Sequence, residues 1–217
     1  MQQQPSSNEK KDRVIIKIIV LGSSNVGKTA LIKRYTTGKF SEDRTATVGA
    51  DFMTKLVDIM GYDVVMQIWD TAGQERFHQG TIGAPFYRGS NGCLLVYDVT
   101  NEKSIEQLRQ WRDELIYRMD SESYFPIVVV GNKIDKRTEE NAVNQTEVLQ
   151  WCRDNEYGHV ETSAKDDSGV HAAMIAITAL ALEQRKEGKM RTDSRVKDTI
   201  KISDMYSTPD KGCMGCI

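Results

Sequence analysis

The sequence contains little proline, cysteine or histidine, and its charges nearly cancel. Its 217 residues include 4 prolines, 4 cysteines and 3 histidines, and the formal net charge is −2. Four cysteines are too few for a disulfide-rich scaffold and are not spaced as a zinc site within the domain, so a reducing cytosol fits best. The small net charge gives no electrostatic reason to expect nucleic acid as the main partner. The expected ligands are therefore small anions and other proteins.

Signals for membrane insertion are also lacking. No run of about 18 apolar residues is present, so we expect no membrane-spanning helix. The first 13 residues, MQQQPSSNEKKDR, lack the apolar core of a signal peptide, and Gln2 stands where N-myristoylation needs a glycine. We expect any membrane contact to be made through the C-terminal end of the sequence.

One glycine-rich stretch organises the sequence. Residues 22–29 read GSSNVGKT and follow directly on the aliphatic run 14–21. Two glycines with four residues between them, followed by Lys and Thr, form the phosphate-loop pattern. Small residues let backbone N–H groups approach a polyphosphate, Lys28 would lie along its β- and γ-phosphates, and Thr29 would offer a hydroxyl to Mg²⁺. The alternative is a chance match in a glycine-bearing turn. The strand expected before the motif and the helix expected after it argue against this alternative.

The rest of the sequence alternates strand and helix patterns, as in a doubly wound α/β domain whose ligands bind at the carboxyl ends of the strands. Strands are expected at 14–21, 50–59, 64–69, 93–99, 126–131 and 157–161, and helices at 28–37, 104–119, 145–155 and 169–185. We expect a mostly parallel six-stranded sheet with one antiparallel edge strand, from the pair 50–59 and 64–69, and helices on both faces. This domain would span residues 13–186, between a disordered extension, 1–12, and a flexible tail, 187–217.

A second motif, DTAGQE at residues 70–75, follows the end of an expected strand. Asp70 stands where a Mg²⁺-holding carboxylate belongs, because it would lie near the phosphate loop. Gly73 could offer its N–H to a γ-phosphate, and Gln74 could orient a water. The alternative is a surface turn rich in turn-forming residues.

Two more motifs follow the next strands and would recognise a base. In NKID, residues 132–135, Asp135 would accept hydrogen bonds from the N1–H and the 2-amino group of guanine. Adenine lacks both donors, so the carboxylate would be buried unpaired against it. TSAK, residues 162–165, would close the other edge of the base, with Ala164 acting through its backbone N–H.

Together GSSNVGKT, Thr47, DTAGQE, NKID and TSAK resemble the five guanine-nucleotide motifs of the Ras-like small GTPases, over about residues 16–183. Within that superfamily, IWDTAGQERF and FYRG resemble the Rab family, and GADFMTK and WRDE look like its branch that serves late endosomes and lysosomes. The resemblance implies a small G domain, which is a P-loop NTPase fold.

The resemblance also implies roles for individual residues. Mg²⁺ would be ligated by Thr29 and Thr47 and held through water by Asp70, and Phe40 would pack on the guanine ring. Contacts to GTP or GDP are implied at Ser24, Asn25, Val26, Gly27, Lys28, Thr29, Ala30, Phe40, Thr47, Gly73, Asn132, Lys133, Asp135, Ser163, Ala164 and Lys165. The aromatic residues Phe52, Trp69 and Phe86 match the triad by which Rab proteins present their nucleotide state to effectors; ordinary core packing is the alternative.

The implied activity is hydrolysis of GTP to GDP and phosphate, slow without an activating protein. Gln74 would position the water, Lys28 and Mg²⁺ would neutralise charge, and loss of the γ-phosphate would release Thr47 and Gly73. Implied partners are a guanine nucleotide exchange factor, a GTPase-activating protein, a GDP-dissociation inhibitor or Rab escort protein, and effectors in vesicle transport. The implied location is the cytosolic face of endosomal or lysosomal membranes.

The second switch departs from the family pattern. Residues 77–86 are about two residues longer than usual in Rab proteins, and Gly80, Gly83 and Pro85 disfavour the helix normally found there. We therefore expect a locally non-helical segment and weaker hydrolysis. An alternative function is a GTP-binding scaffold that hydrolyses little GTP. An ATP-dependent phosphotransferase is a third, more remote alternative.

Smaller departures concern three other places. Arg44 is either an arginine finger supplied in cis or a solvated charge of the polar loop 38–49, the first switch. Asn25 replaces a common glycine, a harmless change because Asn tolerates a positive φ. Cys213 and Cys216 resemble, at a wider spacing, the cysteines that carry geranylgeranyl groups in Rab proteins, and two lipids would anchor the chain stably. Two free thiols on the tail are the alternative.

Overall fold

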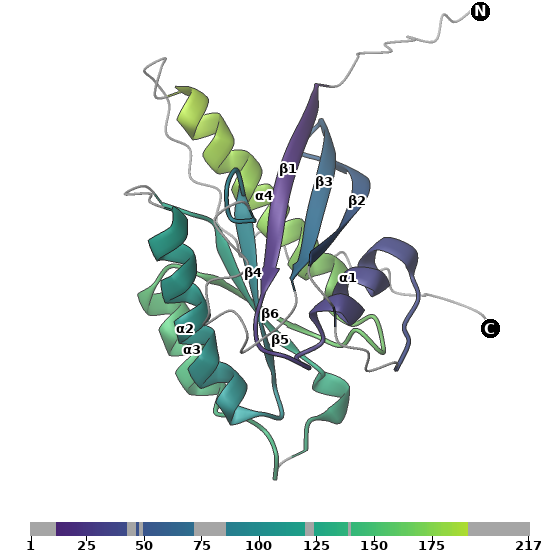
Figure 1. Ribbon diagram of the computed structural model, residues 1–217, viewed down its shortest axis with the longest axis vertical. Coiled ribbons are helices and arrows are strands. Elements are labelled where there is room, and N and C mark those ends of the chain that lie inside the picture. Colours follow the sequence, from purple (N-terminus) through teal and green to yellow (C-terminus); the bar gives the residue numbers. More distant parts are fainter. Residues whose placement is uncertain are drawn as a thin grey trace, which may run out of the picture.

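In the computed structural model, the described residues are 12–42, 47, 50–71, 86–119, 124–138 and 140–190. They form a six-stranded sheet with helices on both faces (Figure 1). The strands are β1 (Arg13–Leu21), β2 (Ala50–Ile59), β3 (Tyr62–Thr71), β4 (Gly92–Asp98), β5 (Ile127–Asn132) and β6 (Gly158–Thr162). Their spatial order is β2-β3-β1-β4-β5-β6, and all neighbours are parallel except β2 and β3. The predicted sheet is confirmed, including its antiparallel edge.

The centre of the sheet is formed by the most continuously apolar segments of the sequence. β1 lies between β3 and β4, with Ile19 opposite both Trp69 and Cys93. Every residue of β4 and of β5 is buried. Such strands are covered on both faces, which is why their sequences do not alternate between apolar and polar residues.

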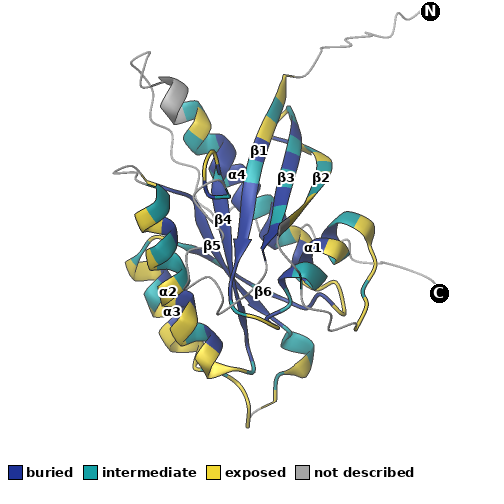
Figure 2. Ribbon diagram, viewed as in Figure 1, coloured by how far each residue is buried: buried dark blue, intermediate teal, exposed yellow. Residues whose placement is uncertain are grey.

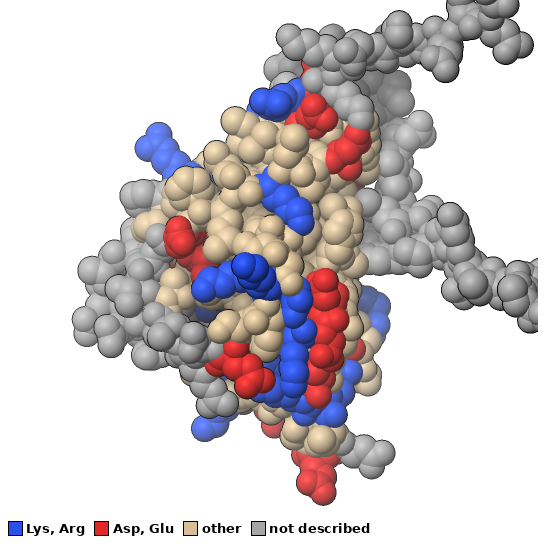
Figure 3. Space-filling model, turned by 90° about the vertical axis from the view of Figure 1, so that its right-hand side faces the viewer, with Lys and Arg blue, Asp and Glu red and all other residues tan. Residues whose placement is uncertain are grey.

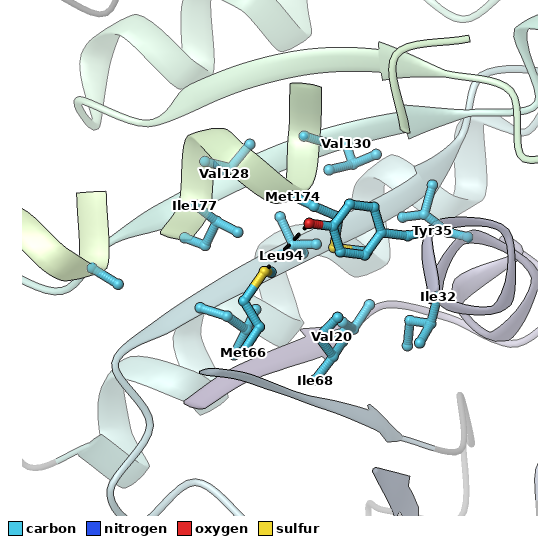
Figure 4. Packing of buried hydrophobic residues seen from close by; sticks show 14 of the residues in the cluster. Val20, Ile32, Tyr35, Met66, Ile68, Leu94, Val128, Val130, Met174 and Ile177 are labelled. Atoms are coloured by element: carbon cyan, nitrogen blue, oxygen red, sulfur yellow. Dashed lines mark hydrogen bonds between the residues drawn. The ribbon is translucent and has the colours of Figure 1, made fainter. Parts of the chain in front are cut away.

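The helices are arranged in two layers. Helices α1 (Lys28–Thr37) and α4 (Val170–Met190) cover one face, and α2 (Glu102–Met119) and α3 (Gln145–Asp154) cover the other (Figure 1). Under α1 and α4, Tyr35 reaches across the core and its hydroxyl donates to the Met66 sulfur at 3.4 Å (Figure 4). Fully burying one aliphatic side chain contributes about 1.5–3 kcal/mol, so these layers hold the sheet from both sides.

Most element bounds agree with the sequence predictions within one or two residues. Asn144 caps α3, because its side chain accepts from the Glu147 N–H at 3.4 Å. The predicted end of the last helix at Arg185 is wrong, since α4 continues to Met190. The backbone hydrogen bonds of a helix do not require an apolar stripe, so a helix can continue beyond the apolar pattern from which its end was predicted. Near this end of α4, the Lys186 ammonium lies 4.4 Å from the centre of the Tyr62 ring.

Several predictions concern residues that the structure does not describe. The expected N-terminal extension up to residue 11 and the tail from 191 onward lie outside the described residues. Within the described part of the chain, no helix combines the length and the apolar character needed to cross a bilayer.

Among the described residues, part of the face of β2, β3 and β1 opposite α1 stays exposed. It carries Phe52, Leu56 and Ile15, which are all more than half exposed, and Figure 2 shows exposed positions on these strands. On the face shown in Figure 3, acidic and basic side chains lie next to one another, in keeping with the small net charge.

Candidate functional site

The phosphate-loop stretch forms a tight turn between β1 and α1. A Cβ on Gly22 would lie 2.2 Å from the Val96 carbonyl oxygen, and one on Gly27 would lie 2.4 Å from the Asn132 amide nitrogen. Only glycine fits such approaches, and Gly27 at φ 95° also begins the helix. Asn25 has φ 64°, a left-handed conformation of the kind that Asn was expected to tolerate in this loop. The loop backbone is therefore held against the ends of β4 and β5.

Lys28 is the buried cation of this loop. Its ammonium donates to the carbonyl oxygens of Gly22 at 2.8 Å and Ser23 at 3.0 Å, and the residue is only 5% exposed. Burial lowers the pKa of Lys28 to about 8, against an opposing effect of the Asp70 carboxylate. A buried charge of this kind gains strongly from an anion placed next to it. Ser24, Val26 and Ala30 lie in the same loop and the first turn of α1.

Two hydroxyls and a carboxylate meet beside the loop. The Oγ1 atoms of Thr29 and Thr47 are 2.7 Å apart. Asp70 is 5% exposed, and among the described residues its Oδ1 has no hydrogen-bond partner. Burial raises the pKa of Asp70, while a hydrogen bond from Thr29 and the charge of Lys28 act in the opposite direction. The structure thus brings together the three residues that the sequence assigned to a metal.

The two hydroxyl oxygens and the Asp70 carboxylate are suitable ligands for Mg²⁺. It prefers oxygen ligands and keeps several waters and phosphate oxygens in its coordination shell. No cluster of three or more His, Cys, Asp or Glu side chains suited to a metal is found among the described residues, so any ion here would depend on hydroxyl and phosphate oxygens. The partnerless Asp70 oxygen, buried next to two hydroxyls, is the observation that points to a cation.

Asn132 connects the phosphate loop to the TSAK stretch. Its amide nitrogen donates to the Val26 carbonyl at 2.9 Å. Its Oδ1 accepts from the Thr162 hydroxyl at 3.1 Å and from the Ala164 N–H at 3.3 Å. Asn132 is 1% exposed, so these bonds are sheltered from water. Segments more than a hundred residues apart are thereby fixed to one another at the carboxyl edge of the sheet.

The NKID stretch turns sharply after β5. Lys133 takes φ 69° and begins the short 3₁₀ helix η2 (Ile134–Lys136), which the sequence reasoning did not predict. The Ser163 hydroxyl donates to Asp135 Oδ1 at 2.8 Å and accepts from the Asp166 N–H at 3.0 Å. Asp135 and the TSAK loop therefore face the same space.

Asp98 is a site residue that the sequence reasoning missed. Its Oδ2 lies 2.6 Å from the Lys133 ammonium. Burial alone would raise the pKa of Asp98, but hydrogen bonds from Lys133 and Thr100 outweigh it, and the pKa is lowered. The available signal was its position at the end of β4, level with Asn132 in the neighbouring strand.

Arg34 was also missed. This residue of α1 donates to the carbonyl oxygens of Ala164 and Lys165, and its guanidinium lies 5.8 Å from the centre of the Phe40 ring. No sequence pattern marked it, because a charged residue on a helix is usually a solvated one.

The aromatic residues expected to face effectors form one cluster on the open half of the sheet. Phe52 and Trp69 are stacked with ring centres 5.3 Å apart, and Phe86 meets the edge of Trp69 at 5.8 Å. Lys17 lies 4.5 Å from the centre of the Trp69 ring and donates to the Arg88 carbonyl at 2.9 Å. Phe52 is 53% exposed, so core packing does not account for it.

Other candidate residues lie outside the part that the structure describes. They are Gly73, Gln74, Arg44, the glycines and proline of residues 77–85, Cys213 and Cys216. The expectation of a non-helical second switch and both readings of Arg44 stay predictions.

Comparison with known proteins gives consistent matches. The model of the Ras family matches residues 17–183. The chain is 45% identical over 183 residues to the GTP-binding protein yptV5 of Volvox carteri, which covers 83% of this chain and 88% of that protein. It is 45% identical over 204 residues to Ras-related protein Rab-7a of Paramecium octaurelia, with 92% and 96% covered. With human Ras-related protein Rab-9A it shares 43% identity over 185 residues, with 83% and 90% covered.

These matches agree with the geometry of the site. The matched segment begins within β1 and ends within α4, so it contains the phosphate loop, the carboxylate and hydroxyl cluster, and the NKID and TSAK stretches. The chain therefore belongs to the Ras family and, within it, to the Rab GTPases.

Proposed function

We propose that the chain is a GTP-hydrolysing switch that binds its nucleotide along the carboxyl edge of the sheet. The family match supports GTP as the substrate class. The observation that carries the proposal is the Asn132 side chain, which holds the phosphate loop and the TSAK stretch together through three hydrogen bonds. The phosphate-binding and base-selecting motifs then lie at two ends of one site.

At the phosphate end, the loop N–H groups and Lys28 bind the nucleotide. Lys28 would exchange its bonds to the Gly22 and Ser23 carbonyls for phosphate oxygens. The positive N-terminus of α1 favours the same anion. Thr29, Thr47 and Asp70 would hold Mg²⁺, which when bound neutralises charge on the β- and γ-phosphates.

At the base end, the carboxylate of Asp135 selects guanine. It would accept from the N1–H and 2-amino groups, while Ala164 donates its N–H to the base from the other edge. Lys133, held by Asp98, and Phe40 would pack against the ring. The Ser163 hydroxyl already fixes one Asp135 oxygen, so the carboxylate is pre-organised.

The chemical step is the attack of water on the γ-phosphorus, with GDP as leaving group. Gln74 would orient the water, and Lys28 would stabilise the charge that develops on the phosphate oxygens. Thr47 and Gly73 would respond to the γ-phosphate and move when it is lost, so hydrolysis changes the surface that partners see. The scaffold alternative depended on residues 77–86, and no contact among the described residues favours it.

Nucleotide retention with and without metal tests this assignment. We expect Thr29→Ala to release GDP faster than the wild type in Mg²⁺ and to respond little when EDTA is added. Thr37→Ala is the matched control, because it removes an exposed hydroxyl at the other end of the same helix, which donates to the Lys33 carbonyl at 2.7 Å and accepts from the Lys39 N–H at 3.3 Å. A Thr29→Ala protein with wild-type retention and wild-type EDTA sensitivity would contradict the metal site.

Regulators and effectors are proposed as partners by family membership. The aromatic cluster of Phe52, Trp69 and Phe86 would be the surface that effectors contact, because Phe52 is 53% exposed and Trp69 directly precedes Asp70 in the sequence. An exchange factor, an activating protein and a GDP-dissociation inhibitor or Rab escort protein would complete the cycle. Loss of GTP-dependent pull-down by Phe52→Ala, with Leu56→Ala unaffected, would test the cluster.

We further propose that Cys213 and Cys216 carry geranylgeranyl groups that anchor the chain. The cysteines within the described residues are unsuitable, since Cys93 and Cys152 are buried and burial raises the pKa of both thiols. Intact mass from a eukaryotic host should show two prenyl additions in the wild type and none in the Cys213→Ser/Cys216→Ser variant. An unmodified wild-type mass would refute the anchor.

The proposed location is the cytosolic face of endosomal or lysosomal membranes, on the strength of the similarity to proteins named Rab-7 and Rab-9. Imaging of a tagged chain beside compartment markers, with and without both tail cysteines, tests this. A wild-type signal that stays diffuse would contradict it.

A further inference from the structure

Arg34 uses all three nitrogens of its guanidinium to hold backbone carbonyls. Nε donates to the Ala164 oxygen at 2.7 Å, Nη2 to the Lys165 oxygen at 2.6 Å and Nη1 to the Gly38 oxygen at 2.8 Å. Two of these carbonyls belong to the TSAK loop, about 130 residues along the chain from Arg34. A planar guanidinium has a fixed fork of donors, so three simultaneous bonds fix the positions of the groups that accept them.

One of the carbonyls leads directly to the base-selecting carboxylate. The peptide that contains the Lys165 carbonyl also contains the Asp166 N–H, and the two point in opposite directions because the peptide is planar and trans. That N–H donates to the Ser163 hydroxyl at 3.0 Å, which in turn donates to Asp135 at 2.8 Å. Arg34 is therefore connected to Asp135 through one peptide unit and one hydroxyl.

The third carbonyl and the aromatic contact connect Arg34 to the start of the first switch. Gly38 ends α1 with φ 70°, and its N–H bonds back to the Arg34 carbonyl at 3.0 Å. Two residues later, the Phe40 ring lies 5.8 Å from the Arg34 guanidinium carbon. The same cation thus contacts the loop at the edge of the base site and the ring expected on its face.

We propose that Arg34 is a positioning residue for the guanine base, which orients Asp135 through the TSAK loop and fixes Phe40. The inference rests on the base site proposed above. Without Arg34 the loop carbonyls would be free to turn, and the Ser163 hydroxyl that directs Asp135 toward the 2-amino group would lose its fixed position. The phosphate end, held by Lys28 and Thr29, would keep its geometry.

The test compares nucleotide dissociation with the chemical step. We expect Arg34→Ala to raise the GDP dissociation rate at least about tenfold, since three bonds from one cation to backbone carbonyls are lost. Inosine diphosphate lacks the 2-amino group, so the preference for GDP over it should narrow in the variant. The single-turnover rate of preloaded GTP should stay at the wild-type value. Arg34→Lys keeps the charge but not the planar fork of donors, so its GDP dissociation rate should fall between those of the wild type and Arg34→Ala.

The matched control is Arg185→Ala, which also removes a guanidinium bound to a carbonyl, that of Ile15, far from the site. It should dissociate GDP as the wild type does, and all variants should be compared below their melting temperatures. Wild-type dissociation from Arg34→Ala, an equal rise for both nucleotides, or a wild-type rate for Arg34→Lys would overturn the inference. A wild-type chain that binds no guanine nucleotide would instead refute the proposed function.

Discussion

Removing the Asn132 side chain should destabilise the domain more than any surface change. Asn132→Ala deletes three hydrogen bonds and leaves the Val26 carbonyl, the Thr162 hydroxyl and the Ala164 N–H without that partner in a region that is 1% exposed at Asn132. At about 1–2 kcal/mol for each of these three unsatisfied groups, the free energy of unfolding should fall by about 3–6 kcal/mol. That is a large part of the roughly 5–15 kcal/mol typical of a domain.

Thermal unfolding of the nucleotide-free protein measures this loss. For a domain of this size, 1 kcal/mol shifts the melting temperature by about 2–4 °C, so we expect a decrease of roughly 6–24 °C. The control is Asn155→Ala, which removes another amide side chain away from the site. The Asn155 amide nitrogen donates to the Trp151 carbonyl at 2.8 Å, and its oxygen accepts from Arg112 at 3.2 Å.

GDP should stabilise the Asn132→Ala protein less than the wild type, because the two ends of its site are no longer fixed to one another. With GDP, the melting temperature of the Asn155→Ala protein should rise by as much as that of the wild type. If Asn132→Ala melts within a few degrees of the wild type and gains the full increment with GDP, the reasoning about this residue is refuted.

Three further changes have outcomes that follow from single contacts. Gly27→Ala should lower the free energy of unfolding more than Gly61→Ala, as denaturant titration of the two variants would show. Both glycines have a positive φ, but only the Cβ added at Gly27 would meet another residue, the Asn132 amide. Lys28 has a pKa lowered to about 8 from 10.5, so the unfolded chain binds more protons between these values, and the wild type should gain stability relative to Lys28→Met as pH rises through that window. Burial lowers the pKa of His159 below 6.5, so the wild type should lose stability relative to His159→Gln as pH falls below that value, which acid titration of both proteins would show.

The parts of the fold that follow local patterns could be predicted from the sequence. The helix at 28–37 has the predicted bounds, and the strands were found because buried parallel strands are continuous aliphatic runs. Asn25 could be judged from its tolerance of positive φ alone. The site motifs were predictable because each follows a strand end.

What could not be predicted depends on contacts between distant segments. Arg34 and Asp98 acquire their roles only when α1 meets the TSAK loop and when β4 lies beside β5. Likewise, the Tyr97 hydroxyl reaches His159 at 3.1 Å because Gly131, in the strand between them, has no side chain in the way. The extension of α4 was missed because the predicted end was placed where the apolar period stops, and the helix continues beyond that point.

The central claim is that Asp135 selects guanine at one end of a site whose other end binds phosphate through Lys28. Equilibrium titration of the wild type and Asp135→Ala with GDP and ADP in Mg²⁺ tests it most directly. We expect the wild type to prefer GDP and Asp135→Ala to bind GDP at least about a hundredfold more weakly, since two bonds to a carboxylate are lost. A wild type that does not distinguish GDP from ADP, or an Asp135→Ala protein that binds GDP as tightly as the wild type, would contradict it.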